Sequence, residues 1–190
     1  MTIEAKIVCD SVNSAEIRLT TLTLNYPRFV HEELLTHRIF SRNSSSSRAI
    51  PVVKQIQELI DNPAIPLKFL KNRKGMQATE EIKDQDEAKK VWLDGRDQAV
   101  EIARRLIKLE VHKEYTNRLL EPFSHISVVL TSTGFENFFE LRRHKDAMPE
   151  IKVLADNIYE ALELNTPVEL EDGDWHIPFI DENAYEQIAK

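Results

Sequence analysis

Residues 17–40 read IRLTTLTLNYPRFVHEELLTHRIF, and this stretch decides the fold. Its first ten residues are mostly Ile, Leu and Thr in alternating rows, which predicts a β-strand paired with a second strand around residues 5–9. Pro27 suits the first turn of a helix, and the following residues place Phe29, Glu33 and His37 on one side at four-residue spacing. The stretch therefore predicts a strand that passes directly into a helix ending near Phe40.

The rest of the chain is mainly helical in pattern. Helices are predicted over residues 51–60, 84–111, 113–121, 135–141 and 151–164, and a strand from Ile126. Residues 41–51 and 61–84 predict irregular connections, and ELEDGDW after Pro167 predicts a surface turn. We expect an α+β, helix-dominated fold with a small antiparallel sheet, one domain over residues 1–190, and the helix over 84–111 as the backbone of the core.

Composition and charge exclude several classes of function. The 190 residues are 42% hydrophobic and 30% charged, as in soluble globular proteins, and their net charge of −7 opposes binding to nucleic acid. No apolar run is long enough to span a membrane, and the N-terminus lacks a signal-peptide pattern, so we expect a cytoplasmic protein. The lone Cys9 and the scattered histidines have no metal-ligand spacing, so we assign no metal.

Residues 36–48, THRIFSRNSSSSR, concentrate hydrogen-bond donors. Serine hydroxyls, arginine side chains and free N–H groups at the start of the next helix suit one phosphate group, and this predicts a nucleotide site. The alternative is that four consecutive serines form a flexible solvated linker and that the arginines make surface ion pairs. The position between two amphipathic helices favours the nucleotide site.

Three motifs together resemble flavin-dependent thymidylate synthases. THRIFSRNSSSSR resembles that family's signature of RHR, a spacer and S-x-N-x-x-S-x-R. NRLLEP over residues 117–122 and NFFELRRHKDAMPEI over residues 137–151 resemble two further motifs and follow in the family's order. The resemblance covers most of residues 17–180.

The resemblance implies roles for particular residues. Arg142 is the catalytic residue, which touches the uracil and helps to polarise it. The implied substrate-binding residues are Glu33, Ser46, Ser47, Arg48, Arg118 and Arg142. The implied cofactor-binding residues are His37, Arg38, Ile39, Asn43 and Asn137. Without the resemblance, Arg118 and Arg142 would be read as a helix-end charge and a surface ion pair.

The resemblance also implies an activity and an assembly. The expected reaction is FAD-dependent reductive methylation of dUMP to dTMP, with methylene-tetrahydrofolate and NADPH as co-substrates, in a homotetramer with shared active sites. Redox chemistry of this kind belongs to the flavin, since no side chain can supply it.

The chain departs from the family pattern at several positions. Thr36 replaces the first arginine of RHR, Ser44 a glutamate, and Met148 a glutamine, while Glu33 stands where glutamine is frequent. The family branch with Trp175–Pro178-like segments continues into a flavin-holding S-P-F-E-H element, which residues 1–190 lack. The alternatives are therefore a nucleotide-binding or assembly subunit that needs a second chain for the flavin site, a fragment, or a related pyrimidine nucleotide hydroxymethylase.

Overall fold

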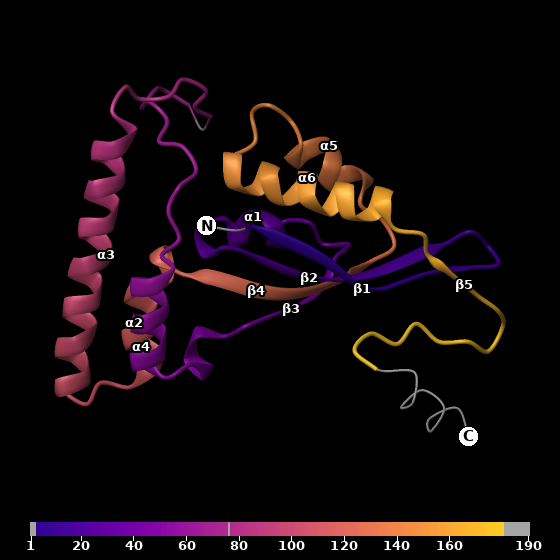
Figure 1. The fold of residues 1–190 in the computed structure, drawn as a ribbon, viewed down its shortest axis with the longest axis horizontal. Helices are drawn as coiled ribbons and strands as arrows, with labels where there is room; N and C mark the ends of the chain where they lie inside the picture. Colours follow the sequence, from indigo (N-terminus) through magenta and orange to yellow (C-terminus); the bar gives the residue numbers. More distant parts are fainter. Residues whose placement is uncertain (1–2, 76, 181–190) are drawn as a thin grey trace.

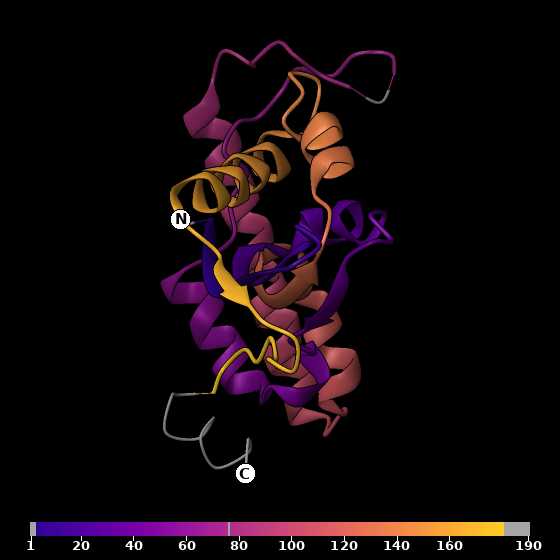
Figure 2. The same cartoon turned by 90° about the vertical axis from the view of Figure 1, so that its right-hand side faces the viewer.

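The computed structural model describes residues 3–75 and 77–180, which form a five-stranded sheet with helices on one face and at one end (Figures 1 and 2). The strand order is β3-β4-β2-β1-β5. The strands are β1 (Glu4–Asn13), β2 (Arg18–Pro27), β3 (Ser41–Ser44), β4 (His125–Ser132) and β5 (Val168–Leu170). All neighbours are antiparallel except β1 and β5, which are parallel. The predicted α+β fold is confirmed, with a parallel edge strand where we had predicted only a turn.

Helices lie in two places. In Figure 1, α5 and α6 cover one face of the sheet, while α2, α3 and α4 stand beside its end. The helices are α1 (His31–Leu35), α2 (Val52–Asp61), α3 (Gln85–Lys108), α4 (Lys113–Thr116), α5 (Glu136–Arg142) and α6 (Pro149–Leu164). Short 3-10 turns are η1 (Arg28–Val30), η2 (Ser47–Ala49), η3 (Asn117–Leu119) and η4 (Glu121–Phe123).

The main core lies between the sheet and α6. Register pairs Leu22 with Leu130 and Leu24 with Val128, so these side chains share the covered face. The fully buried α6 side chains that join this core are Ile151, Leu154 and Ile158. Each buried side chain of this size contributes roughly 1.5–3 kcal/mol. The sheet and α6 therefore hold the domain together.

The longest helix, α3, is not the backbone of the core as predicted. Only Val100 and Ala103 of α3 are buried, in a smaller cluster with α2 and Leu120. Other apolar side chains of α3 are exposed, including Val91 at 61% and Ile102 at 46%. The apolar stripe is helical as predicted, but only a small part of it is buried, in the cluster with α2 and Leu120.

The predicted helix through Phe40 is wrong in its second half. The chain begins with η1, forms only five residues of α1, and then closes in turns where the His37 N–H bonds the Leu34 carbonyl and the Phe40 N–H bonds the His37 carbonyl. These turns bury His37 and Phe40 against Phe138. Aromatic packing into the core therefore overrides the helical pattern.

The other sheet face is polar and is partly crossed by the chain after β5. Thr21 and Thr131 are paired across β2 and β4, and their hydroxyls are 2.8 Å apart. The His176 imidazole lies over this face, 2.9 Å from the Thr21 hydroxyl and 2.8 Å from the Ser11 hydroxyl. Cys9 also contacts the imidazole, at 3.5 Å. The segment after β5 is thus fixed to the sheet by its histidine.

Candidate functional site

Arg142, at the end of α5, is the centre of one polar group. Its Nε donates to His37 Nε2 at 3.0 Å, and its Nη1 donates to Glu33 Oε2 at 2.9 Å. Its Nη2 donates to the Glu33 carbonyl and to the Thr36 hydroxyl at 3.1 Å. We call Glu33, Thr36, His37 and Arg142 the Arg142 group. Arg142 is therefore brought together with residues more than a hundred positions earlier in the chain.

Burial shifts the pKa values of His37 and Glu33 in the Arg142 group. His37 is only 4% exposed, and desolvation lowers its pKa, with Arg142 and Arg42 acting in the same direction. The imidazole is therefore neutral at pH 7, and its Nε2 accepts the Arg142 hydrogen bond. Desolvation raises the pKa of the Glu33 carboxyl, although Arg142 opposes that rise. The group holds one fixed cation beside a carboxylate and a neutral ring.

Glu121, at the start of η4, is the centre of a second polar group. Its Oε1 accepts from the Ser47 hydroxyl at 2.6 Å and from Arg118 Nη1 at 3.2 Å. Arg28 Nη1 lies 3.6 Å from the same oxygen. We call Arg28, Ser47, Arg118 and Glu121 the Glu121 group. The second and third motifs thus contribute to different groups, and only the second joins the serine-rich segment.

The loop that carries Ser47 is tied down from the same side. Asn117 is fully buried, and its Nδ2 donates to the Ser47 carbonyl at 2.7 Å and to the Ile50 carbonyl at 2.9 Å. Arg48 is largely exposed and pairs with Glu114 at 3.0 Å. The serine-rich segment is therefore not a free linker, and its η2 turn is anchored on the α4–η4 region.

β3 separates the two groups. Residues 41–51 were predicted as a loop, and that prediction is wrong for Ser41–Ser44, which pair antiparallel with β4. A sheet edge tolerates polar side chains because the ladder is made by the backbone. Four strand residues span roughly 13 Å. The chain enters β3 from His37 of the Arg142 group and leaves it toward Ser47 of the Glu121 group, so the predicted residues of this segment fall into two groups at opposite ends of a strand.

The remaining predicted residues are more exposed. Ile39 is 60% exposed and lies beside Gly134. A Cβ added to Gly134 would lie 3.1 Å from the Cδ1 of Ile39. Three others, Arg38, Ser46 and Asn137, are also exposed. Their side chains make no hydrogen bond within residues 3–75 and 77–180. These side chains are available to bind a ligand or a second chain.

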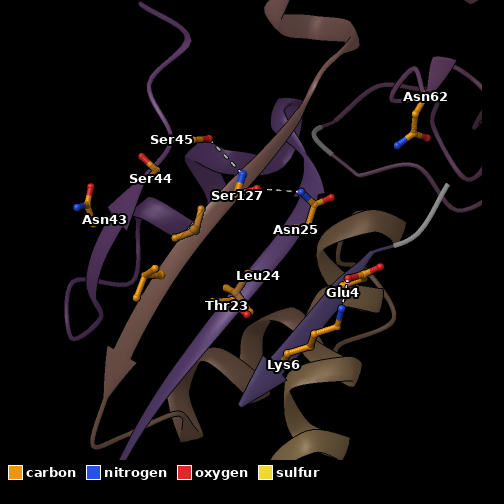
Figure 3. Close-up of a pocket in the computed structure, with 12 residues that line it drawn as sticks. Glu4, Lys6, Thr23, Leu24, Asn25, Asn43, Ser44, Ser45, Asn62 and Ser127 are labelled. Atoms are coloured by element: carbon orange, nitrogen blue, oxygen red, sulfur yellow. Dashed lines mark hydrogen bonds and ion pairs between the residues drawn. The ribbon is translucent and has the colours of Figure 1, made fainter. Parts of the chain in front are cut away.

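A cavity of about 710 Å³ opens on the polar face of the sheet (Figure 3). Asn43 and Ser44 of β3 line it, together with Ser45 just beyond. Across the cavity floor the Asn25 amide donates to the Ser127 hydroxyl at 3.1 Å. The lining also includes the Glu4–Lys6 ion pair and the aliphatic residues Leu24, Val128 and Val129. Apolar surface with a few amides and hydroxyls suits a hydrogen-bonding ring system. Asn43 is the one predicted cofactor residue in this cavity.

Arg28 and Glu121 were missed by the sequence reasoning. Arg28 was assigned no role, although it lies in the PRFVHEELLTHR segment that also resembles the family, and its position directly after β2 brings it to Glu121. Glu121 lies within the NRLLEP motif, but that motif assigned a role only to its arginine, Arg118. Among the described residues, no three His, Cys, Asp or Glu side chains gather as a metal site requires. Within the same residues, no helix combines the length and apolar character that crossing a membrane requires.

The family model Thy1, thymidylate synthase complementing protein, matches residues 14–168. The chain belongs to this family. The motif-based resemblance is thereby confirmed, and the match includes both the Arg142 group and the Glu121 group. No curated protein sequence matches the chain.

Solved structures similar to this Thy1 chain include PolB from Streptomyces cacaoi, described as a UMP/dUMP methylase. The form bound to 5-Br dUMP has a TM-score of 0.70 and 16% sequence identity over 85% of this chain and 90% of that one. The form bound to 5-Br UMP has a TM-score of 0.64 and 15% identity over 85% of this chain and 88% of that one. At such identities the likeness shows a shared fold.

Proposed function

We propose that the protein methylates dUMP to dTMP, with FAD as cofactor and methylene-tetrahydrofolate and NADPH as co-substrates. The observation that carries this is Arg142, whose guanidinium is fixed by Glu33 and His37. A fixed guanidinium in a half-buried site stabilises negative charge that develops on a bound pyrimidine. Membership of the Thy1 family and the likeness to a UMP/dUMP methylase support the same substrate.

The nucleotide phosphate is assigned to the side of the Glu121 group. Arg118 has a side chain 60% exposed, and both of its hydrogen bonds to Glu121 use Nη1, so Nε and Nη2 have no partner among the described residues and can serve an anion. Arg48, 58% exposed, adds a second guanidinium on the neighbouring turn. Guanidinium groups bind phosphate in a charge-assisted, often bidentate way.

FAD fits the chain in part. The amide- and hydroxyl-lined cavity beside Asn43 suits the hydrogen-bonding edge of an isoalloxazine, and its volume of about 710 Å³ is within the range of cofactor sites. His37, Arg38, Ile39 and Asn137 would hold further parts of the cofactor. When bound, FAD would supply the hydride that reductive methylation requires.

We further propose that two copies complete each site, within a homotetramer. The separation of the Arg142 and Glu121 groups by β3, and the exposed apolar side chains of α3 and of Ile39, support this assembly. Two alternatives remain open to test. A subunit that needs a second chain for the flavin site would bind dUMP without FAD, and a hydroxymethylase would release a product heavier by one oxygen.

The visible absorption spectrum of the purified protein, with and without dUMP, tests the flavin first. Activity is then measured as tritium release from 5-labelled dUMP in the presence of NADPH and methylene-tetrahydrofolate, with product mass by mass spectrometry. The proposal predicts a yellow protein, tritium release and dTMP. Protein that stays colourless after incubation with FAD, and that releases no tritium, would overturn it.

A further inference from the structure

The Glu121 carboxylate receives donors from three separate segments of the chain. Arg28 opens η1 directly after β2 and forms an ion pair with the carboxylate, while Ser47 opens η2 and Arg118 lies in η3, and both of these donate hydrogen bonds to it. Two of these three are residues that sequence motifs assign to the nucleotide, whereas Glu121 and Arg28 carry no assigned role. One carboxylate therefore contacts the side chains of all three segments, which contacts of Asn117 and Arg28 with backbone carbonyls also hold near one another.

Charge explains why a carboxylate is needed there. The side chain of Arg28 is only 16% exposed, its Nε is buried without a partner among the described residues, and desolvation lowers its pKa. Arg118 is close enough to lower that pKa further, so the two guanidinium groups repel each other. Glu121 lies between them and offsets that repulsion. Without it, two cations would be held together with no countercharge until an anion arrived.

The geometry shows whether Glu121 positions Arg118 for the phosphate or competes with the phosphate for Arg118. A carboxylate that competed with a phosphate would cover the outward face of its arginine. Glu121 is instead 20% exposed beneath Arg118, which is 60% exposed, and it holds that arginine through Nη1 alone. Ser47 is 4% exposed and its hydroxyl donates to Glu121, so the hydrogen that a phosphate would need is committed to that carboxylate. The outward donors are left to Arg118 and its neighbours.

We propose that Glu121 is a positioning residue, which holds Ser47, Arg118 and Arg28 in the arrangement that binds the phosphate of the substrate. The proposal rests on the proposed function, because it takes that phosphate to be the one of dUMP. Glu121 arranges the hydrogen-bond donors without contacting the nucleotide itself. Ser47 then contributes through the shape of its turn rather than through a hydroxyl bond to the phosphate.

The test compares dUMP with deoxyuridine, which lacks the phosphate, by calorimetry with FAD present. Glu121→Ala is expected to weaken dUMP binding about ten-fold or more and to leave deoxyuridine binding unchanged. Glu121→Gln keeps an acceptor for Ser47 and Arg118, so it should fold like the wild type and lose less dUMP affinity than Glu121→Ala. Glu101→Ala, an exposed carboxylate of α3 without a partner among the described residues, is the matched control and should change neither affinity.

The outcomes are distinct. A wild-type protein that binds dUMP no better than deoxyuridine overturns the proposed function, and the role of Glu121 with it. A wild type that prefers dUMP, with Glu121→Ala and Glu121→Gln keeping the full preference, overturns the positioning role alone. Tighter dUMP binding in Glu121→Ala would also overturn it, since that result identifies Glu121 as a competitor of the phosphate. If Glu121→Ala weakens the binding of dUMP and of deoxyuridine equally, the substitution has damaged the site in general, and this result also counts against the positioning role.

Discussion

Replacing Arg142 with alanine removes the centre of the Arg142 group. The substitution breaks the hydrogen bonds from the guanidinium to Glu33, Thr36 and His37. His37 is almost fully buried, so its Nε2 loses its partner where water has little access. The Glu33 carboxylate loses its countercharge, but it is 30% exposed and regains some hydration. The cost therefore falls mainly on the buried imidazole and partly on the carboxylate.

The expected loss follows from these exposures. Hydrogen bonds to a charged group contribute roughly 1.5–3 kcal/mol when one partner is removed, and partial exposure reduces that contribution. We expect Arg142→Ala to lower the free energy of unfolding by about 2 kcal/mol, which lowers Tm by roughly 4–8 °C in a domain of this size. Arg104→Ala, on the exposed side of α3, should change the stability by less than about 0.5 kcal/mol.

The loss should also depend on pH. The folded protein lowers the pKa of His37, so stability that is present above pH 6.5 or so is lost as the pH falls through the folded pKa. Removing Arg142 brings that pKa nearer its ordinary value, and it raises the pKa of Glu33 further. The first change relieves a loss of stability that acts only at acidic pH, and the second destabilises the variant most at neutral pH, so the difference in unfolding free energy from wild type should narrow on acidification.

Urea unfolding at pH 5 and pH 7.5 measures both effects. A loss below about 0.5 kcal/mol at pH 7.5, or a loss equal at the two pH values, would refute the hydrogen-bonded arrangement around Arg142. A Glu33→Gln and Arg142→Ala double-mutant cycle then isolates the ion pair. Coupling indistinguishable from zero would show that Glu33 and Arg142 act independently.

Three further results are expected. Leu154→Ala, in the fully buried core of α6, should lower the free energy of unfolding by about 2–5 kcal/mol, measured by urea unfolding. His176→Ala should lower it by about 1–2 kcal/mol and should speed the reaction of Cys9 with a thiol reagent, because the imidazole contacts that thiol. Stability should rise between about pH 5 and pH 7 in thermal melts, because burial lowers the pKa of four histidines and protonation then favours the unfolded chain. These are His31, His37, His125 and His176.

The sequence was sufficient where one periodic pattern dominated a segment. The strand over residues 17–26 and the helix over residues 151–164 are both present, because each buries one continuous apolar face in the main core. β3 was missed because its residues, SRNS, are all polar and form an edge strand through backbone pairing alone. No side-chain pattern marks such a strand, so only its partner β4 determines it.

The two site groups differed in how far sequence could predict them. Motifs identified Arg142 and Arg118, yet spacing along the chain gave no means of placing them at opposite ends of β3. That placement depends on β3 being extended, and β3 was the segment read as a loop. Glu121 was missed for a related reason, because a carboxylate next to an arginine is usually a surface pair, and its contact with Ser47 spans 74 residues.

Two departures from the family pattern are explained together by the Arg142 group. Thr36 stands where the family has the first arginine of RHR, and its hydroxyl accepts from Arg142 at 3.1 Å. An arginine there would bring a second guanidinium beside Arg142. Glu33, where glutamine is frequent, supplies the charge that balances the remaining arginine. Both residues accept hydrogen bonds from Arg142, and the group has one cation beside one carboxylate.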